Sequence, residues 1–464
     1  MAAITKEKSK DRELKLINKL AFGFGDVAGA VYAALYGFFM SAFLLDVAGL
    51  RPGAVGIILG SSVIIDAFTD PFIGSLSDRT KSKWGRKRPW LLFGAVPLGI
   101  AFFLHWLVPP LEGFMLVGYY FIVSNLLRFA FTAVNIPYTA LTPEMTRDFD
   151  QRTQLNTFRF MFSIVGSIVA VVLHPVLVDM MGDAIVGHAF SAGIWMLLII
   201  VATITCFVGT FELPHSEPVN PKSYNFIERL QIVFSNRPYL LVTGIYLLSW
   251  LTLQFIQANL LLYTRYWLQA EDQFTTFVAL IQIVAAVFLP IWTIASTKIG
   301  KKGVYIAGAS VWLVTLIALY FIQPGQANFL MIASAFAGIG VSVAYLIPWS
   351  MVPDTIEYNE LQTGERQEGV FYGMFVFLQK LGLAAGLAFS NFALDAAGYV
   401  NAEIIDGVQQ TVAQPDAVLS TLRIIVSLAP AAILALSIPL VIMYPITRKR
   451  YDEIQAELAK RKAS

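Results

Sequence analysis

Long hydrophobic stretches alternate with short polar segments along nearly the whole chain. Each stretch is long enough to cross the hydrocarbon core of a bilayer as a helix, which takes about 20 residues. Several exceed that minimum, so we expect these helices to tilt or to extend beyond the bilayer. The pattern predicts twelve membrane-spanning helices, over residues 20–46, 53–77, 89–109, 113–145, 154–179, 187–212, 238–268, 274–298, 303–322, 327–351, 367–397 and 417–447.

The polar segments fall into two sets by charge. Of the 33 Lys and Arg residues, 27 lie in the two termini and in the connections on the same side of the membrane. The connections on the opposite side hold Arg51 and several acids, among them Asp179 and Glu271. Because basic residues favour the cytoplasmic side, we predict that both termini are cytoplasmic. An even number of helices, such as twelve, agrees with this orientation.

The composition excludes whole classes of protein. The 464 residues are 57% hydrophobic and 14% charged, whereas soluble domains carry about 25% charged residues. A soluble enzyme and a disordered chain are therefore excluded, and a net charge of +2 argues against a nucleic-acid partner. The single cysteine, Cys206, permits no internal disulfide. We expect a monomeric multi-pass protein of the cell (inner or plasma) membrane, surrounded by the lipid bilayer.

Two segments of the chain recur in the same order. The basic loop and helix start at 83–95 resemble 298–309, and the proline-bearing stretch 136–144 resembles 347–354. Both pairs have nearly the same offset, which makes chance recurrence the weaker explanation. Two parallel six-helix repeats are typical of the major facilitator fold, in which substrate binds between the halves. We predict an N-terminal half (1–212), a cytoplasmic linker (213–237), a C-terminal half (238–447) and a cytoplasmic tail (448–464).

Asp66 and Asp70 are the strongest candidate functional residues. Their i,i+4 spacing places both carboxylates on one face of a predicted membrane helix, with Cβ atoms about 5–6 Å apart. Carboxylates inside a bilayer are costly, and they usually serve an ion or proton path. The two carboxylates are suitable ligands for a small alkali metal cation, or they could share a proton. The alternative is a purely structural pair that Arg159 or Lys380 neutralises.

The stretch around these acids resembles a known family. Residues 66–74, followed by Asp78, Arg79 and the basic segment 84–90, are similar to the glycoside–pentoside–hexuronide:cation symporters of the major facilitator superfamily. The resemblance extends along most of the chain. It implies cation-coupled symport of a small-molecule solute by alternating access.

The resemblance also implies which residues bind the coupling cation. Asp66 and Asp70 match the acids of the family's cation site, and Thr69 and Thr132 match its other oxygen-bearing positions. Thr69 stands where an asparagine is known in the family, so the choice between Na⁺ and H⁺ stays open. We expect no other cofactor. The sequence has no nucleophile–base cluster and no phosphate-binding loop, so we expect no enzymatic activity.

Basic residues inside predicted helices are candidates for substrate binding. Lys380 matches the family's lysine in helix 11, and Arg159 matches an arginine in helix 5 that contacts sugar. An unpaired charge inside the membrane is expensive, so each needs a carboxylate or an anionic substrate as partner. A static salt bridge is the alternative for both residues. Arg128 is a weaker candidate, interpreted as a structural charge.

Several positions depart from the family's sugar site. Its two sugar-binding aspartates fall on Ala30 and Asn135, and its helix-10 tryptophan falls on Tyr345. Asp26 is acidic but lies one helical turn from the expected place. These departures argue against a simple galactoside as the substrate. We predict symport of a sugar, glycoside or acidic sugar, with Arg159, Lys380, Asn135, Tyr345 and Asp26 as substrate-binding candidates. The alternative is a lysophospholipid or another amphipathic anionic solute.

Charged residues at the predicted cytoplasmic mouth form a candidate gate. The acids after predicted helix 10 are expected to pair with the basic loops across the two halves. The alternative is that the basic loops only fix the orientation in the membrane. The candidate gating residues are Asp78, Arg79, Arg86, Arg88, Asp354 and Glu357, with Lys87 and Arg366 beside them.

Overall fold

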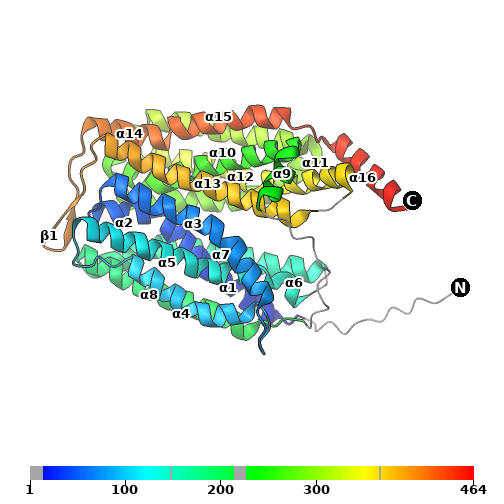
Figure 1. The fold of residues 1–464 in the computed structure, drawn as a ribbon. Coiled ribbons are helices and arrows are strands. Elements are labelled where there is room, and N and C mark those ends of the chain that lie inside the picture. The colour runs from blue at the N-terminus through cyan, green and yellow to red at the C-terminus, as the bar shows by residue number, and fades with distance from the viewer. Residues whose placement is uncertain (1–13, 147–148, 214–225, 365–366, 464) are drawn as a thin grey trace.

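The computed structural model describes residues 14–146, 149–213, 226–364 and 367–463, and these are almost entirely helical. Figure 1 shows two groups of helices, one from each half of the chain, lying side by side. The N-terminal group contains α1 (Leu16–Phe38), α2 (Met40–Asp46), α3 (Pro52–Arg79), α4 (Arg88–His105), α5 (Gly113–Thr139), α6 (Leu141–Met145), α7 (Phe149–Asp179) and α8 (Ala184–Gly209).

The C-terminal group follows a short helix in the predicted linker. The elements are α9 (Phe226–Ser235), α10 (Arg237–Leu262), the π-helix η1 (Tyr263–Leu268), the 3₁₀-helix η2 (Glu271–Gln273), α11 (Phe274–Phe321), α12 (Ala327–Thr363), α13 (Glu368–Ala396), strands β1 (Glu403–Ile405) and β2 (Val408–Gln410), α14 (Asp416–Val426), α15 (Leu428–Met443) and α16 (Arg448–Ala463). The antiparallel β1–β2 hairpin, which the hydrophobic pattern did not predict, lies at the end of the bundle opposite α16 (Figure 1).

The longest helix accounts for two of the predicted crossings. Eleven helices in the described residues are long and apolar enough to span a membrane. One of them, α11, has 48 residues and would be about 72 Å long if straight. Gly300 interrupts it with φ 73° and ψ 165°, a left-handed φ that a side chain would strain. Its two arms fold back on each other, because Gly338 and Gly340 of α12 contact Ile281 on one arm and Trp312 on the other. Twelve crossings are therefore confirmed.

Other predicted helices are broken or extended. The predicted spans 20–46, 113–145 and 417–447 each consist of two consecutive helices, divided at Phe39, Ala140 and Ser427. The predicted span 327–351 was too short, since α12 continues to Thr363 through Pro348 and Pro353. Large apolar side chains such as Phe114 and Val208 remain 88% and 71% exposed, as expected of surfaces that face lipid.

The contact between α3 and α13 joins the halves beside the bundle centre. Built Cβ atoms on Gly56 and Gly60 of α3 would lie 3.2 Å from the Ala388 carbonyl oxygen and 3.3 Å from the Ala384 carbonyl oxygen of α13. Small residues allow this close approach of helices in a membrane. Position 56 faces 388 and position 60 faces 384, so the helices are antiparallel and this register brings Lys380 within reach of Asp66.

Candidate functional site

A cavity of about 560 Å³ lies between the two halves. Four helices of the N-terminal half (α1, α3, α5 and α7) and four of the C-terminal half (α10, α11, α12 and α13) contribute to its wall. Four of its lining residues carry charge, namely Asp66, Asp70, Arg128 and Lys380. The cavity therefore has the position expected of a solute site in a two-half transporter.

Asp66 and Asp70 share one counter-ion. The Lys380 ammonium nitrogen donates hydrogen bonds to Asp66 Oδ2 at 2.7 Å and to Asp70 Oδ2 at 2.5 Å. The side chains are largely buried, with exposed fractions of 4% for Asp66 and 16% for Asp70 and Lys380. The salt bridge that the sequence left as an alternative is present, and it connects the N-terminal half to the C-terminal half. Buried carboxylates without such a partner would be strongly destabilising.

The two predicted threonines differ in their relation to this pair. Thr132 of α5 donates its hydroxyl to Asp66 Oδ1 at 2.5 Å and lies 3.0 Å from Asp70 Oδ1, so it joins both carboxylates. Thr69 hydrogen-bonds the Asp66 backbone carbonyl of its own helix at 3.1 Å. Thr132, Asp66 and Asp70 line the cavity, whereas Thr69 is not among the lining residues.

Arg128 belongs to the same cluster, although it was a weaker candidate on sequence grounds. Its Nη1 lies 3.9 Å from Asp66 Oδ2, and its guanidinium stacks on Tyr36 with 4.3 Å to the ring centre. The clue available in the sequence was its spacing: Arg128 precedes Thr132 by four residues, so the two share a face of α5. Only the packing of α5 against α3 places that face beside Asp66.

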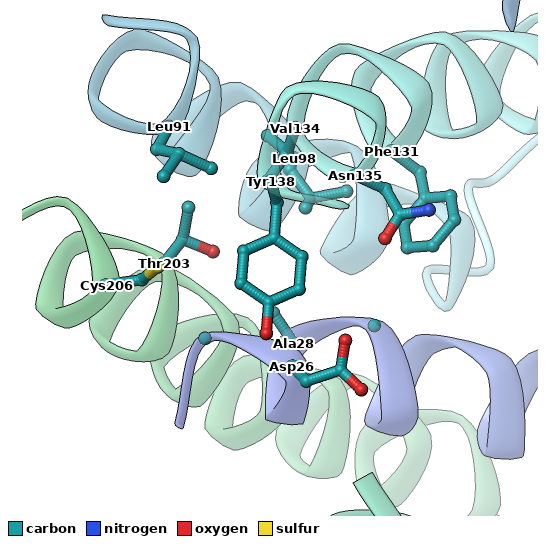
Figure 2. A pocket seen from close by; sticks show the side chains of 12 residues that line it. Asp26, Ala28, Leu91, Leu98, Phe131, Val134, Asn135, Tyr138, Thr203 and Cys206 are labelled. Atoms are coloured by element: carbon teal, nitrogen blue, oxygen red, sulfur yellow. The ribbon is translucent and has the colours of Figure 1, made fainter. Parts of the chain in front are cut away.

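Asp26 and Arg159 form a second ion pair apart from the central cavity. Arg159 Nε donates to Asp26 Oδ1 at 3.0 Å, and neither residue is among those that line the 560 Å³ cavity. Asp26 instead borders a void of about 10 Å³, shown in Figure 2, with Asn135, Tyr138, Thr203 and Cys206 around it. That volume is about the space for one water molecule.

Asn135 and Tyr345 do line the central cavity. Asn135 lies between the small void and the large cavity, and Tyr345 packs against Trp250 with ring centres 5.4 Å apart. The wall also carries amide and hydroxyl groups that sequence reasoning missed, among them Gln254, Gln257, Gln282, Ser163 and Ser167. No short motif marks these residues, because they come from three different helices.

The cytoplasmic charges of the N-terminal half pair with one another. Lys87 contacts Asp78 at 2.5 Å, and Arg86 contacts Glu144 at 3.0 Å. The Glu212 carboxylate accepts hydrogen bonds from the backbone N–H groups of Arg86, Lys87 and Arg88. Gly85, at φ 106°, makes room for that carboxylate. Arg88 donates its side chain to the Phe207 carbonyl oxygen, and Arg79 is exposed.

The acids after α12's membrane-spanning part pair within the C-terminal half. Asp354 accepts two hydrogen bonds from Lys301, at 2.7 and 2.8 Å, and Glu357 accepts one from Gln455 of α16 at 2.5 Å. The expected pairing across the halves was therefore wrong for Asp354 in this conformation. Lys301, which follows the kink at Gly300 in α11, supplies the partner of Asp354 from the same half. Arg366 lies outside the described residues.

The halves are joined instead at the opposite, outer end. Asp46 of α2, 1% exposed, accepts hydrogen bonds from Arg265 Nη1 at 2.5 Å, Tyr266 Oη at 2.9 Å and Tyr399 Oη at 2.6 Å. Asn401 donates to the Leu45 and Leu50 carbonyl oxygens. We call these contacts the outer closure (Asp46, Arg265, Tyr266, Tyr399 and Asn401). The described cytoplasmic ion pairs remain within one half, so the geometry is that of a carrier closed on its outer side.

Comparison with known proteins agrees with this architecture. The sequence model of a family described as MFS/sugar transport protein matches residues 21–448. An uncharacterised symporter of Synechocystis sp. is 34% identical, covering 97% of this chain and 97% of that protein. A sodium-dependent lysophosphatidylcholine symporter of Danio rerio is 27% identical, covering 99% and 91%. The solved nucleoside transporter NupG shares the fold, with a TM-score of 0.63 at 14% identity over 93% of this chain and 100% of that one. The chain is thus a multi-pass membrane protein that belongs to the MFS/sugar transport protein family.

Proposed function

We propose that this protein is a symporter in which a cation, Na⁺ or H⁺, bound at Asp66 and Asp70 drives the movement of an organic solute through the central cavity. The observation that carries the proposal is the position of Lys380. Its ammonium group, which comes from the C-terminal half, contacts both carboxylates of the N-terminal half. The names of the relatives, which include symporters of Synechocystis sp. and Danio rerio, support the same reading.

Lys380 acts as a tethered substitute for the coupling cation. A cation that enters between Asp66 and Asp70 competes with the ammonium group for the same oxygen atoms, and the Thr132 hydroxyl supplies a further oxygen. Once Lys380 is displaced, an ionic contact between the halves is lost. Cation binding therefore changes the relative stability of the two states, which is the requirement for coupling.

The wall of the cavity fits a solute with one polar and one apolar face. Gln254, Gln257 and Gln282 offer amide donors and acceptors, and the Trp250–Tyr345 pair offers an aromatic surface. Hydroxyl-binding amides beside an aromatic face suit a sugar or glycoside. A glycoside or acidic sugar is accordingly the first substrate class that we propose.

A lysophospholipid or another amphipathic anion is the second candidate class. The specific support is the mainly apolar character of the other wall residues, such as Phe131, Leu253 and Leu289. The similarity over 99% of the chain to a symporter of lysophosphatidylcholine points in the same direction. Both classes use the same cation site, so the coupling proposal does not depend on the choice.

Uptake into proteoliposomes tests the coupling. The full chain is reconstituted and supplied with sugars, uronides and lysolipids, each with a Na⁺ gradient, a proton gradient or neither. Asp66→Asn and Asp70→Asn are expected to abolish gradient-driven accumulation. Glu112→Gln, an exposed acid in the α4–α5 connection, is the matched control and is expected to behave as the wild type. Unimpaired accumulation by the Asp66→Asn variant would overturn the proposal.

A further inference from the structure

Arg128 faces the central cavity as a rigidly held cation. Its guanidinium lies over the rings of Tyr36, at 4.3 Å, and Tyr32, at 5.7 Å. Tyr36 is itself fixed by Ser62, with 3.1 Å between the two hydroxyl oxygens. Stacking on aromatic faces orients an arginine without using its hydrogen-bond donors. Arg128 also makes a side-chain hydrogen bond to Tyr36, and its remaining donors are held in a fixed direction.

The nearby carboxylate does not use these donors fully. Asp66 Oδ1 already accepts from Thr132 and Oδ2 from Lys380. The closest approach of Arg128 to Asp66 is 3.9 Å, which is longer than a hydrogen bond. The Arg128 Nε atom is buried and has no hydrogen-bond partner among the described residues. A buried donor without a partner is unfavourable, so the guanidinium of Arg128 retains unused capacity to hydrogen-bond an oxyanion.

The charges of the cavity indicate when such an oxyanion would bind. Asp66 and Asp70 balance Lys380 and Arg128, and these four are the charged residues that line the cavity. The arrival of a monovalent cation between the carboxylates gives the cluster one excess positive charge. Inside a membrane protein that charge is costly, and an anion in the cavity neutralises it. Cation and anion would then each raise the other's affinity by the same factor.

We propose that Arg128 binds an anionic group, a carboxylate or a phosphate, on the transported solute, and that the bound cation and this anion neutralise each other in the loaded carrier. The inference rests on the proposed cation coupling and specifies the solute that is coupled. The planar guanidinium matches the geometry of either oxyanion. For a singly charged anion carried with one monovalent cation, transport is electroneutral.

Matched pairs of probes distinguish the charge from the rest of the solute. One pair is nitrophenyl glucuronide and nitrophenyl glucoside, and the other is lysophosphatidic acid and a monoacylglycerol with the same chain. Binding to the purified full chain is measured by thermal shift, with and without Na⁺. In the wild type the anionic member of one pair is expected to bind about tenfold more tightly than its neutral partner, the size expected of a charge-assisted hydrogen bond. A preference within the first pair indicates that the solute is a uronide, and a preference within the second pair indicates that it is a lipid phosphate.

Variants assign this preference to Arg128. Arg128→Gln is expected to abolish the preference for the anion and to retain the stabilisation by Na⁺. Arg128→Lys is expected to show part of the wild-type preference for the anion. The matched control is Arg423→Gln. Arg423 also stacks on two aromatic rings, at 4.3 and 4.5 Å, but it donates to the Tyr320 carbonyl oxygen and is not among the residues that line the cavity. An undiminished preference in Arg128→Gln, or equal binding of both members in the wild type, overturns the proposal.

An electrical measurement on the wild type covers the case in which Arg128→Gln fails to fold. Gradient-driven uptake of the singly charged glucuronide is expected to proceed at the same rate with and without an inside-negative potential. A potential-dependent rate overturns the assignment of neutralising charges. If the gradient drives uptake of the neutral and the anionic member equally, the proposed symport is supported and the proposed role of Arg128 is refuted. If no gradient drives uptake of either member, the proposed symport itself is refuted.

Discussion

Lys380 and Asp66 are separated by 314 positions in the chain, and the Lys380 ammonium nitrogen lies 2.7 Å from Asp66 Oδ2. The same nitrogen contacts Asp70 Oδ2. A lysine of one half thus contacts both carboxylates of the cation site that we propose in the other half. Any ligand that separates Lys380 from these carboxylates also weakens a contact between the halves, which links site occupancy to conformation.

Replacing Lys380 by glutamine is expected to tighten cation binding. The variant removes the competing ammonium and leaves two carboxylates opposed by Arg128 alone among the cavity's charged residues. We expect the Kd for Na⁺ to fall about tenfold or more, equivalent to about 1.4 kcal/mol, and gradient-driven accumulation to be lost. Thermal shift against Na⁺ concentration measures the first effect. Lys298→Gln, an exposed lysine before Gly300, is the control, and an unchanged Kd in Lys380→Gln would contradict competition.

Asp46→Asn is expected to open the outer closure. The substitution weakens hydrogen bonds from Arg265, Tyr266 and Tyr399 to a buried carboxylate, worth roughly 1.5–3 kcal/mol for a charged group. The outward-open population should rise at least about tenfold. A cysteine placed at Gln257, in a Cys206→Ala background, should then react faster with an impermeant thiol reagent added outside. Asp416→Asn serves as control, and an unaltered labelling rate for Asp46→Asn would refute a closing role.

A charge swap at the cytoplasmic end distinguishes pairing within a half from pairing between halves. Lys301→Asp and Asp354→Lys should each lower the Tm, because each leaves the partly buried pair at 2.7 Å without its attraction. The double variant should recover part of the loss. Combining Asp354→Lys with Arg86→Glu should give no recovery, since Arg86 pairs with Glu144 of its own half. Recovery in that second combination would favour the pairing across the halves.

Gly340→Leu is expected to destabilise the C-terminal half strongly. A Cβ at Gly340 would overlap the side chain and backbone of Trp312, which is 1% exposed and has little room to move. We expect a loss of about 3 kcal/mol or more, typical of severe overpacking. The Tm and the yield of monodisperse protein report the effect. Gly118→Ala is the matched control, because nothing lies within 4 Å of its built Cβ, and it should be neutral or slightly stabilising.

Features that depend on residues near one another in the chain could be predicted without the structure. Hydrophobic length sets the spans, because backbone groups in a bilayer must bond within their own helix. The distribution of Lys and Arg sets the orientation. The i,i+4 spacing sets Asp66 and Asp70 on one face of α3. Even the kink at Gly300 fell in a loop that the polar pattern had marked between two predicted helices.

Which charged side chains pair with one another depends on how the helices pack in three dimensions. Lys380 reaches Asp66 because Gly56 and Gly60 let α3 and α13 approach closely, a relation that no local pattern encodes. The same is true of Arg128, whose helix face could have been turned to lipid, and of Arg159, which pairs with Asp26 beside a small void. A buried charge takes the nearest partner that packing supplies. For that reason the sequence could identify the charged residues inside the membrane, and the fold assigned their partners.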